Sequence, residues 1–144
     1  MSTSYDPPPR VYQDLARFRV PRGFRGRNPL LVQLWGLVQA TLFRRSPKIC
    51  FGWRRFLLRV FGARIGQGVL VRPTAEITYP WKLSIGDYSW IGDAAVLYSL
   101  GHITIGAHTV ISQHAYLCAA THAINDILFT QYAKPIDIGS ECWI

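Results

Sequence analysis

Acidic residues, cysteines and long apolar runs are all scarce in this chain of 144 residues. The three cysteines (Cys50, Cys118 and Cys142) are an odd number at spacings that match no zinc motif, so we expect buried thiols in a reducing compartment. The strongly apolar residues 30–43 fall well short of the roughly 20 residues that a helix needs to cross a bilayer. Residues 1–10 are rich in proline and lack the apolar centre of a secretory signal, which predicts a cytoplasmic protein.

The few acidic residues are unevenly distributed along the chain. Residues 1–72 contain 14 Lys and Arg but 2 Asp and Glu, whereas residues 73–144 contain 2 and 6, which together give the net charge of +8. A basic front half indicates an anionic partner: nucleic acid, membrane phospholipid or a phosphorylated ligand. No nucleic-acid-binding motif accompanies the arginines, which alternate with large apolar residues, so we expect no nucleic-acid partner.

The front half is predicted to form a basic arm, over residues 10–29, followed by two short amphipathic helices. The first helix is expected over residues 30–43 and the second over residues 50–62. One face of the second helix is predicted to be apolar, with Gly62 as its C-terminal cap. That face comprises Trp53, Phe56, Leu57, Val60 and Phe61, and the opposite face Arg54, Arg55 and Arg59. The helices are expected to pack on the rest of the protein and also to suit peripheral contact with a membrane surface.

From Ile65 onward, aliphatic residues recur every six positions, and we call them guide residues. Three guide residues make one coil, and successive coils start twenty residues apart; the guides are Ile65, Val71, Ile77, Ile85, Ile91, Leu97, Ile105, Ile111 and Leu117. A fourth coil starts at Ile138, 33 residues after Ile105, which leaves an insertion of 13 residues. Such fixed self-similarity is typical of repeat architectures.

A period of six predicts short strands separated by turns. Because six is even, every guide residue on a strand faces the same side, and the residue two positions earlier faces that side too. These earlier positions are all small or apolar, from Ala63 to Cys142, and none is charged. Glycine after several guides is expected to provide positive φ at the corners. The sequence therefore predicts an all-β solenoid, a three-sided parallel β-helix over residues 63–144, preceded by the arm and helices of residues 1–62.

The segments "IGDYSWIGD", "ITIGAHTVIS", "YLCAATH" and "PIDIGSECWI" resemble the hexapeptide-repeat acyltransferases, whose β-helix is left-handed. The front segments "QDLARFRVPRGFRG", "QLWGLVQATLFRRSP" and "GWRRFLLRVFGARIG", with "ITYPWKLSIGDYSWIGD", resemble more narrowly the colanic acid biosynthesis acetyltransferases. The resemblance implies O-acetyl transfer from acetyl-CoA, as co-substrate, to a sugar hydroxyl in extracellular or capsular polysaccharide biosynthesis. It also implies a homotrimer with no metal, placed in the cytoplasm near lipid-linked sugar carriers at the inner face of the membrane.

The resemblance assigns roles to three residues. A loop is expected at about residues 119–135, and His122 at its start corresponds to the general base of similar enzymes, a role that suits imidazole chemistry near neutral pH. Ser99 lies near the place of an acceptor-binding residue, and Trp143 matches a tryptophan that could stack at the donor pocket; an ordinary corner serine and a packed outward aromatic are the alternatives. Similar proteins read His-Asp where this chain has Ala123.

Two other functions stay open at this point. Similar enzymes continue beyond the position of Ile144 with coils that supply an oxyanion donor, so we expect the 144-residue chain to be C-terminally truncated and poor in turnover. It would then be a non-catalytic module that binds a membrane surface or a partner. A carbonic-anhydrase-like zinc site is the less favoured possibility, since His102, His108 and His114 are six apart and should point about 120° apart. The aromatic residues Tyr79, Trp81, Tyr88 and Trp90 are expected to dock the front helices, or else to bind sugar.

Overall fold

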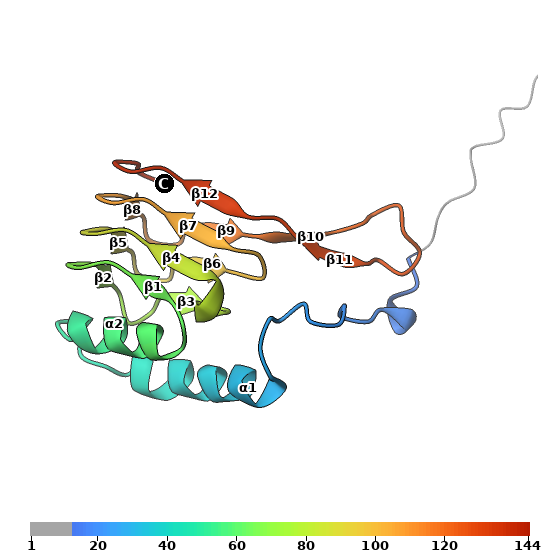
Figure 1. Ribbon diagram of the computed structural model, residues 1–144, viewed down its shortest axis with the longest axis horizontal. Coiled ribbons are helices and arrows are strands. Elements are labelled where there is room, and N and C mark those ends of the chain that lie inside the picture. The colour runs from blue at the N-terminus through green and yellow to red at the C-terminus, as the bar shows by residue number, and fades with distance from the viewer. Residues whose placement is uncertain (1–12) are drawn as a thin grey trace, which may run out of the picture.

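The computed structural model describes residues 13–144, in which two short helices precede a stack of parallel strands (Figure 1). The proline-rich start and the first residues of the predicted arm, up to residue 12, lie outside the described residues. The rest of the arm includes the 3-10 turn η1 (Leu15–Arg17). The helical segments that follow are α1 (Pro29–Val38), the π-helical η2 (Gln39–Phe43) and α2 (Phe51–Val60).

The strands form three parallel sheets, and each of the first three coils contributes one strand to every sheet. The first sheet contains β1 (Arg64–Ile65), β4 (Leu83–Ile85), β7 (Ile103–Ile105) and β12 (Ile136–Ile138). The second contains β2 (Leu70–Val71), β5 (Trp90–Ile91) and β8 (Val110–Ile111). The third contains β3 (Glu76–Ile77), β6 (Val96–Tyr98) and β9 (Tyr116–Cys118), and the 3-10 turn η3 (Pro80–Lys82) leads on to β4. An antiparallel hairpin, β10 (Ala120–His122) with β11 (Gln131–Ala133), projects beyond the stack (Figure 1).

The register between coils follows the period of twenty. Ile65 pairs with Ile85, and Ile85 pairs with Ile105. Ile105 then pairs with Ile138, because the hairpin is inserted between the third and fourth coils. The predicted stacking of guide residues in one row is therefore confirmed, and the three sheets are the walls of a prism.

The interior of the prism is built from the guide residues and the residues two positions before them. The nine guide residues from Ile65 to Leu117 are at most 8 % exposed. Ser89 and Thr109, at the earlier positions, are polar and fully buried. The Ser89 hydroxyl donates to the Gly106 carbonyl (2.7 Å) and accepts from the Thr109 backbone N–H (3.0 Å). These hydroxyls satisfy backbone groups of the coil above, so a polar interior position costs little here.

The glycines after the guide residues serve a purpose other than the predicted one. Gly86 and Gly92 do not have positive φ; the corner residues that do lie three positions after a guide residue, and they are Gly68, Tyr88, Ala94, His108, His114 and Glu141. A Cβ on Gly92 would lie 2.5 Å from the Gln113 backbone nitrogen, and one on Gly86 would lie 2.5 Å from that of Ala107. Glycine is needed because the next coil passes too close for a side chain.

The two helices close the lower end of the prism and share its core. Asn28 caps α1 by accepting from the Leu30 N–H (2.9 Å), and Pro29 occupies the first turn, where it is favoured. The Trp35 indole donates to the Ile77 carbonyl (2.7 Å), and Phe43 and Leu58 are fully buried. Between residues 13 and 144, no helix has both the length and the apolar character needed to span a bilayer.

The predicted faces of α2 are only partly correct: Leu57 and Phe61 are buried as expected, but the other residues of the predicted apolar face are not. Arg54 is completely buried, whereas Trp53, Phe56 and Val60 are 41, 53 and 62 % exposed. The Arg54 guanidinium donates to the carbonyls of Val71 (2.6 Å), Pro47 (2.8 Å) and Lys48 (2.6 Å) and to the Ser46 hydroxyl (2.8 Å). Burial lowers the pKa of this guanidinium from its ordinary value. Helical periodicity assigns an arginine to the solvent-exposed face. Here the first coil and the turn before α2 present several backbone carbonyls, which a long side chain with several N–H donors can reach.

The prediction of buried thiols is wrong for Cys118, which is exposed; Cys50 and Cys142 are half-buried. Cys118 follows the guide residue Leu117 directly, so the alternation of the strand turns its side chain outward. All three cysteines are free.

Candidate active site

The hairpin leaves the prism between the last strand of the third sheet, β9, and the last strand of the first sheet, β12 (Figure 1). At its base the Lys134 N–H donates to the Ala119 carbonyl (3.1 Å). Gly101 lies directly beneath, and a Cβ there would be 2.6 Å from the carbonyl oxygens of both Ala119 and Lys134. The close approach of this backbone makes Gly101 part of the support of the hairpin, which sequence reasoning missed because this glycine does not follow a guide residue.

The turn of the hairpin is held by Asp126. Its carboxylate accepts from the Leu128 N–H (3.0 Å), from the Thr130 N–H (3.3 Å) and from the Thr130 hydroxyl. These hydrogen bonds, that of the Thr130 hydroxyl first, lower the pKa of Asp126 from its ordinary value. Phe129, between them, has a φ of 50°, a left-handed conformation that turns its carbonyl toward the start of the hairpin.

His122 lies on β10, half-buried, with its ring fixed on two sides. Its Nδ1 is 2.8 Å from the Phe129 carbonyl oxygen. Since a carbonyl can only accept, Nδ1 carries the proton, and Nε2 of the neutral ring keeps a lone pair for a base. The imidazole stacks on the Phe129 ring at 4.2 Å and 8°, and the Phe18 ring lies 5.7 Å away on a tilted plane. The Phe129 carbonyl and ring thus fix the orientation of the imidazole, although the neighbouring Ala123 has no carboxylate.

The N-terminal arm connects the hairpin to the prism. The Asp14 N–H donates to the Ile127 carbonyl (2.7 Å), which places Phe18 of the same arm beside the histidine. Farther along, the arm is tied to the second coil: the Trp81 indole donates to the Arg25 carbonyl (2.7 Å) and the Lys82 ammonium to the Phe24 carbonyl (2.6 Å). Burial lowers the pKa of Lys82 from its ordinary value. The arm therefore forms one wall of the site around His122.

Ser99 is completely buried in the structure. Its hydroxyl accepts from the Tyr79 N–H (2.8 Å) and donates to the Tyr79 carbonyl (3.1 Å). Both hydrogen-bonding functions of the hydroxyl are thereby used to join neighbouring coils. A serine in this state supports the backbone below the hairpin and offers no free group to an acceptor.

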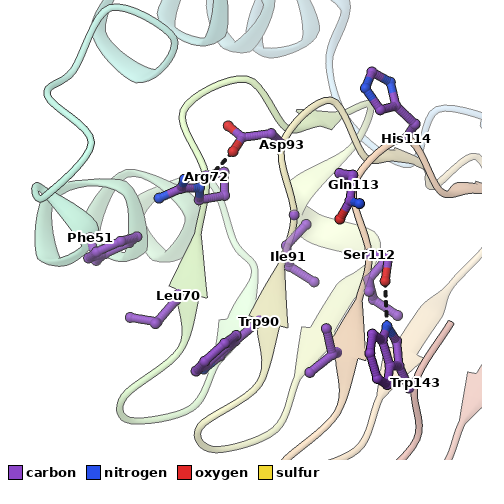
Figure 2. A pocket seen from close by; sticks show the side chains of 13 residues that line it. Phe51, Leu70, Arg72, Trp90, Ile91, Asp93, Ser112, Gln113, His114 and Trp143 are labelled. Carbon is purple, nitrogen blue, oxygen red and sulfur yellow. Dashed lines mark hydrogen bonds and ion pairs between the residues drawn. The ribbon is translucent and has the colours of Figure 1, made fainter.

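Trp143 lies on another face of the prism. It bridges Val110 of β8, which in turn pairs with Trp90 of β5 and, through it, with Leu70 of β2. These outward side chains, with Phe51 at the start of α2, line a groove of about 620 Å³ (Figure 2). Ligand pockets have volumes of this order. Trp143 is 82 % exposed, and its indole donates to the Ser112 hydroxyl (2.5 Å).

One end of this groove is polar. Arg72 and Asp93 form an ion pair there at 2.8 Å, with Gln113 and His114 on the next coil (Figure 2). The groove and His122 are on different faces, since the hairpin follows the third sheet and the groove covers the second. A single copy therefore does not bring His122 and Trp143 together.

The aromatic residues of the second coil divide between two locations. Tyr79 and Trp81 stack at 5.0 Å and 17°, and the Trp81 indole binds the arm at Arg25, so this pair docks the arm where docking of the front helices was predicted. Tyr88 and Trp90 are exposed on other surfaces. Tyr88 stacks on His108 at 5.3 Å. Outward side chains on successive strands lie on different walls of the prism, so residues that are close in the sequence point in different directions.

The remaining histidines do not gather. His102, His108 and His114 are exposed on different corners, and His108 is occupied by its stacking with Tyr88. In the part of the chain that the structure describes, no three His, Cys, Asp or Glu side chains come close enough to hold a metal ion.

Comparison with known proteins places these features in context. The chain is 58 % identical over 132 residues, 92 % of its length and 72 % of the relative's, to an Escherichia coli protein named "Putative colanic acid biosynthesis acetyltransferase WcaF". Its fold matches a hexapeptide-repeat acetyltransferase of Vibrio cholerae with a TM-score of 0.71, at 21 % identity, over 90 % of this chain and 71 % of the other. A structure of that Vibrio protein with acetyl-CoA matches with a TM-score of 0.68, at 21 % identity, over 79 % of this chain and 62 % of the other.

A maltose O-acetyltransferase of Clostridium difficile has the same fold, with a TM-score of 0.69 at 20 % identity over 81 % of this chain and 65 % of the other. No protein-family model matches the sequence. The stacked hexads and these matches define the fold as that of the hexapeptide-repeat acetyltransferases. Within that class, the chain belongs to the colanic acid biosynthesis acetyltransferase family.

Proposed function

We propose that this chain transfers an acetyl group from acetyl-CoA to a hydroxyl of a sugar in an extracellular polysaccharide of the colanic acid type. The observation that carries the proposal is the geometry of His122, whose Nδ1 is bound to the Phe129 carbonyl so that Nε2 is available as a base. The family of the chain and the acetyl-CoA bound to the Vibrio protein support the donor. The Clostridium maltose O-acetyltransferase supports a sugar as acceptor.

In the proposed reaction His122 acts first as a base and then as an acid. Nε2 removes the proton of the acceptor hydroxyl, and the oxygen attacks the thioester carbonyl carbon of acetyl-CoA. The tetrahedral intermediate collapses by breaking the carbon–sulfur bond. The departing thiolate takes the proton from the imidazolium, which leaves an O-acetyl sugar, free CoA and the neutral histidine.

The test is release of the CoA thiol when the purified chain is mixed with acetyl-CoA and a panel of sugars. We expect His122→Ala to lower the sugar-dependent rate by about 10²–10⁴-fold, the usual contribution of general acid–base catalysis. The matched control is His102→Ala, an exposed histidine at a corner of the prism, which should leave the rate unchanged. An unchanged rate in His122→Ala would contradict the assignment.

The same measurement separates this function from a non-catalytic module, because a module without turnover would release no thiol with any sugar. It also tests the expectation of poor turnover from the 144-residue chain. Binding of acetyl-CoA, followed by calorimetry, gives a second readout that does not depend on turnover. We propose that the groove beside Trp143 holds the donor, so Trp143→Ala should weaken that binding.

We infer that copies of the chain assemble as a trimer in which His122 of one copy faces the groove of another. The separation of His122 and Trp143 on different faces supports this arrangement, since a shared site needs both. Co-refolding the two impaired variants, His122→Ala and Trp143→Ala, tests it: mixed assemblies should be more active than either variant alone. If each site were complete within one copy, the mixture would be as inactive as its components.

Three further features belong to the same proposal. The coil is left-handed, as in the hexapeptide-repeat acyltransferases that the sequence resembles. Residues 1–62 and 63–144 are its two units, with the loop at about 119–135 as an insertion. The basic N-terminal half places the enzyme at the inner face of a membrane, near lipid-linked acceptors. An experimental structure checks the first two, and the third is developed below.

A further inference from the structure

The side of α1 that faces away from the prism is apolar. Leu30, Leu34 and Leu37 follow one another at helical spacing on that side, and they are 78, 49 and 62 % exposed. Trp35, on the opposite side, is buried against the prism. Apart from the exposed Gln33, the helix therefore has apolar side chains on both sides, although only one side has a partner within the chain.

The outer side of α2 continues this surface. Trp53, Phe56 and Val60 are spaced three and four residues apart, which puts them on one helical face, and Ile49 lies in the turn just before α2; all four are exposed. The Trp53 indole donates to the Leu42 carbonyl (3.0 Å), which joins the two helical segments. Both helices lie under the first coil, at the end of the prism opposite to β12 (Figure 1). We call the eight residues Leu30, Leu34, Leu37, Leu42, Ile49, Trp53, Phe56 and Val60 the helical stripe.

The surroundings of the helical stripe are basic. From Leu15 to Ala75 the sequence has 13 Lys and Arg and no Asp or Glu. Arg44, Arg45 and Lys48, in the connection between the two helices, are exposed. Arg44 pairs with Glu76 of the first coil at 3.3 Å, and this leaves Arg45 and Lys48 as the cations beside the stripe.

We propose that the helical stripe inserts into the surface of an anionic phospholipid bilayer, with Arg45 and Lys48 at the headgroup phosphates. An apolar surface of this extent is unusual on a soluble monomer. Two ten-residue helices cannot span a bilayer but can lie in its interface, where tryptophan and basic side chains are favoured. A second copy is the poorer occupant, because Glu76 already pairs with Arg44, so two such faces would bring Arg45 and Lys48 of each copy together without further acidic residues to pair them.

The inference extends the membrane contact of the proposed function and does not depend on acetyl transfer. It also accounts for the burial of Arg54, which leaves the large apolar side chains of α2 on the outside. A helix whose only role was to cover the core would bury its large apolar side chains and expose its arginines. The occupant is thus identified by charge: phosphatidylglycerol or another anionic lipid, in preference to a zwitterionic one.

Vesicle flotation of the purified chain tests the proposal. We expect binding to phosphatidylcholine vesicles that contain phosphatidylglycerol, weak binding to phosphatidylcholine alone, and loss of binding at high salt. The double variant Leu37→Ser/Phe56→Ser should weaken binding by about tenfold or more. Arg45→Glu/Lys48→Glu should abolish the preference for phosphatidylglycerol.

Matched controls lie on the hairpin, away from the helices. Ile124→Ser removes a side chain that is 70 % exposed, and Lys134→Glu reverses an exposed charge; neither should change binding. Circular dichroism checks that each variant is folded. Equal binding by Leu37→Ser/Phe56→Ser and Ile124→Ser would overturn the proposal. So would a concentration-dependent dimer, seen by light scattering without lipid, that the double variant abolishes. The thiol-release assay is unaffected by either result, so failure here is distinguishable from failure of the proposed function.

Discussion

The first and second sheets of the prism are built from the same hexads, but their outer surfaces differ in polarity. The outward residues of the first sheet are polar in all four coils: Arg64, Ser84, Thr104 and Asp137. Those of the second are apolar: Leu70, Trp90, Val110 and Trp143. The inward residues of both sheets are buried throughout the first three coils. The period of six thus fixes the interior, while the alternate positions are free to carry a groove on one wall and a solvated surface on another.

The largest expected effect comes from the shared interior. Ile91→Ala, beneath the groove, should lower the free energy of unfolding by about 2–5 kcal/mol, because Ile91 is 1 % exposed and its loss leaves a cavity. Thr104→Ala, outward on the first sheet, should change it by less than about 0.5 kcal/mol. Urea denaturation followed by circular dichroism gives both values. Equal losses would mean that outward and inward positions are not distinguished as the burial indicates.

Trp90→Ala should show that the second sheet binds acetyl-CoA and that the first does not. Trp90 is 53 % exposed, so we expect a loss of stability much smaller than for Ile91→Ala. Acetyl-CoA binding should weaken by about tenfold, since an aromatic side chain of the groove contributes on the order of 1–2 kcal/mol. Thr104→Ala serves again as the control and should bind the donor normally. Weakened binding in both variants would place the donor elsewhere.

Two substitutions at one corner of the prism separate the effect of steric crowding on stability from the effect of a left-handed backbone conformation. Gly92→Ala should destabilise the chain by about 1–3 kcal/mol, because its Cβ would meet the next coil at Gln113. Ala94→Gly, two residues later, should stabilise it by roughly 0.5–1 kcal/mol, since Ala94 has a φ of 53°. Thermal unfolding measures the opposite signs. If both substitutions destabilise, the corner at Ala94 is not strained.

The interior of the prism could be predicted from the sequence, whereas its surfaces could not. Ile85, Ile105 and Ile138 lie in one row because successive coils repeat after twenty residues, with the hairpin inserted between the last two. Arg54 was assigned to the wrong face, because its burial depends on carbonyls of Val71 and Pro47 that only the folded chain brings together. Helical periodicity contains no information about hydrogen-bond acceptors that another segment of the chain supplies.

The candidate site shows the same division. Loop placement and family resemblance point to His122 as a candidate, but the group that orients its ring, the carbonyl of Phe129, is backbone and leaves no side-chain signal. Phe18 reaches the site from more than a hundred residues away through the arm. Ser99 was predicted from its place in the repeat, and its burial follows from the register with Tyr79. Long-range contacts of this kind follow from the fold and are absent from local pattern.

The smallest expected effect concerns the ion pair at the polar end of the groove. Hydrogen bonds from Arg72 and then Thr74 lower the pKa of Asp93 below its ordinary value of 3.8. A carboxyl whose pKa is depressed by folding stabilises the native state above the unfolded pKa, and this contribution is lost as the pH falls through the folded pKa. The pair is partly exposed, so its contribution should be about 0.2–1 kcal/mol.

Asp93→Asn should therefore be less stable than the parent chain at neutral pH, and this difference should disappear as the pH falls through the lowered pKa of Asp93 in the folded chain. Urea denaturation at a series of pH values measures it. Asp126, whose pKa is also lowered, titrates in both proteins and cancels in the comparison. Ser84→Ala, on the polar wall, should show no pH-dependent difference from the parent. A difference in Asp93→Asn that persists unchanged into acid would mean that the carboxylate charge is not what joins the first and second coils at this corner.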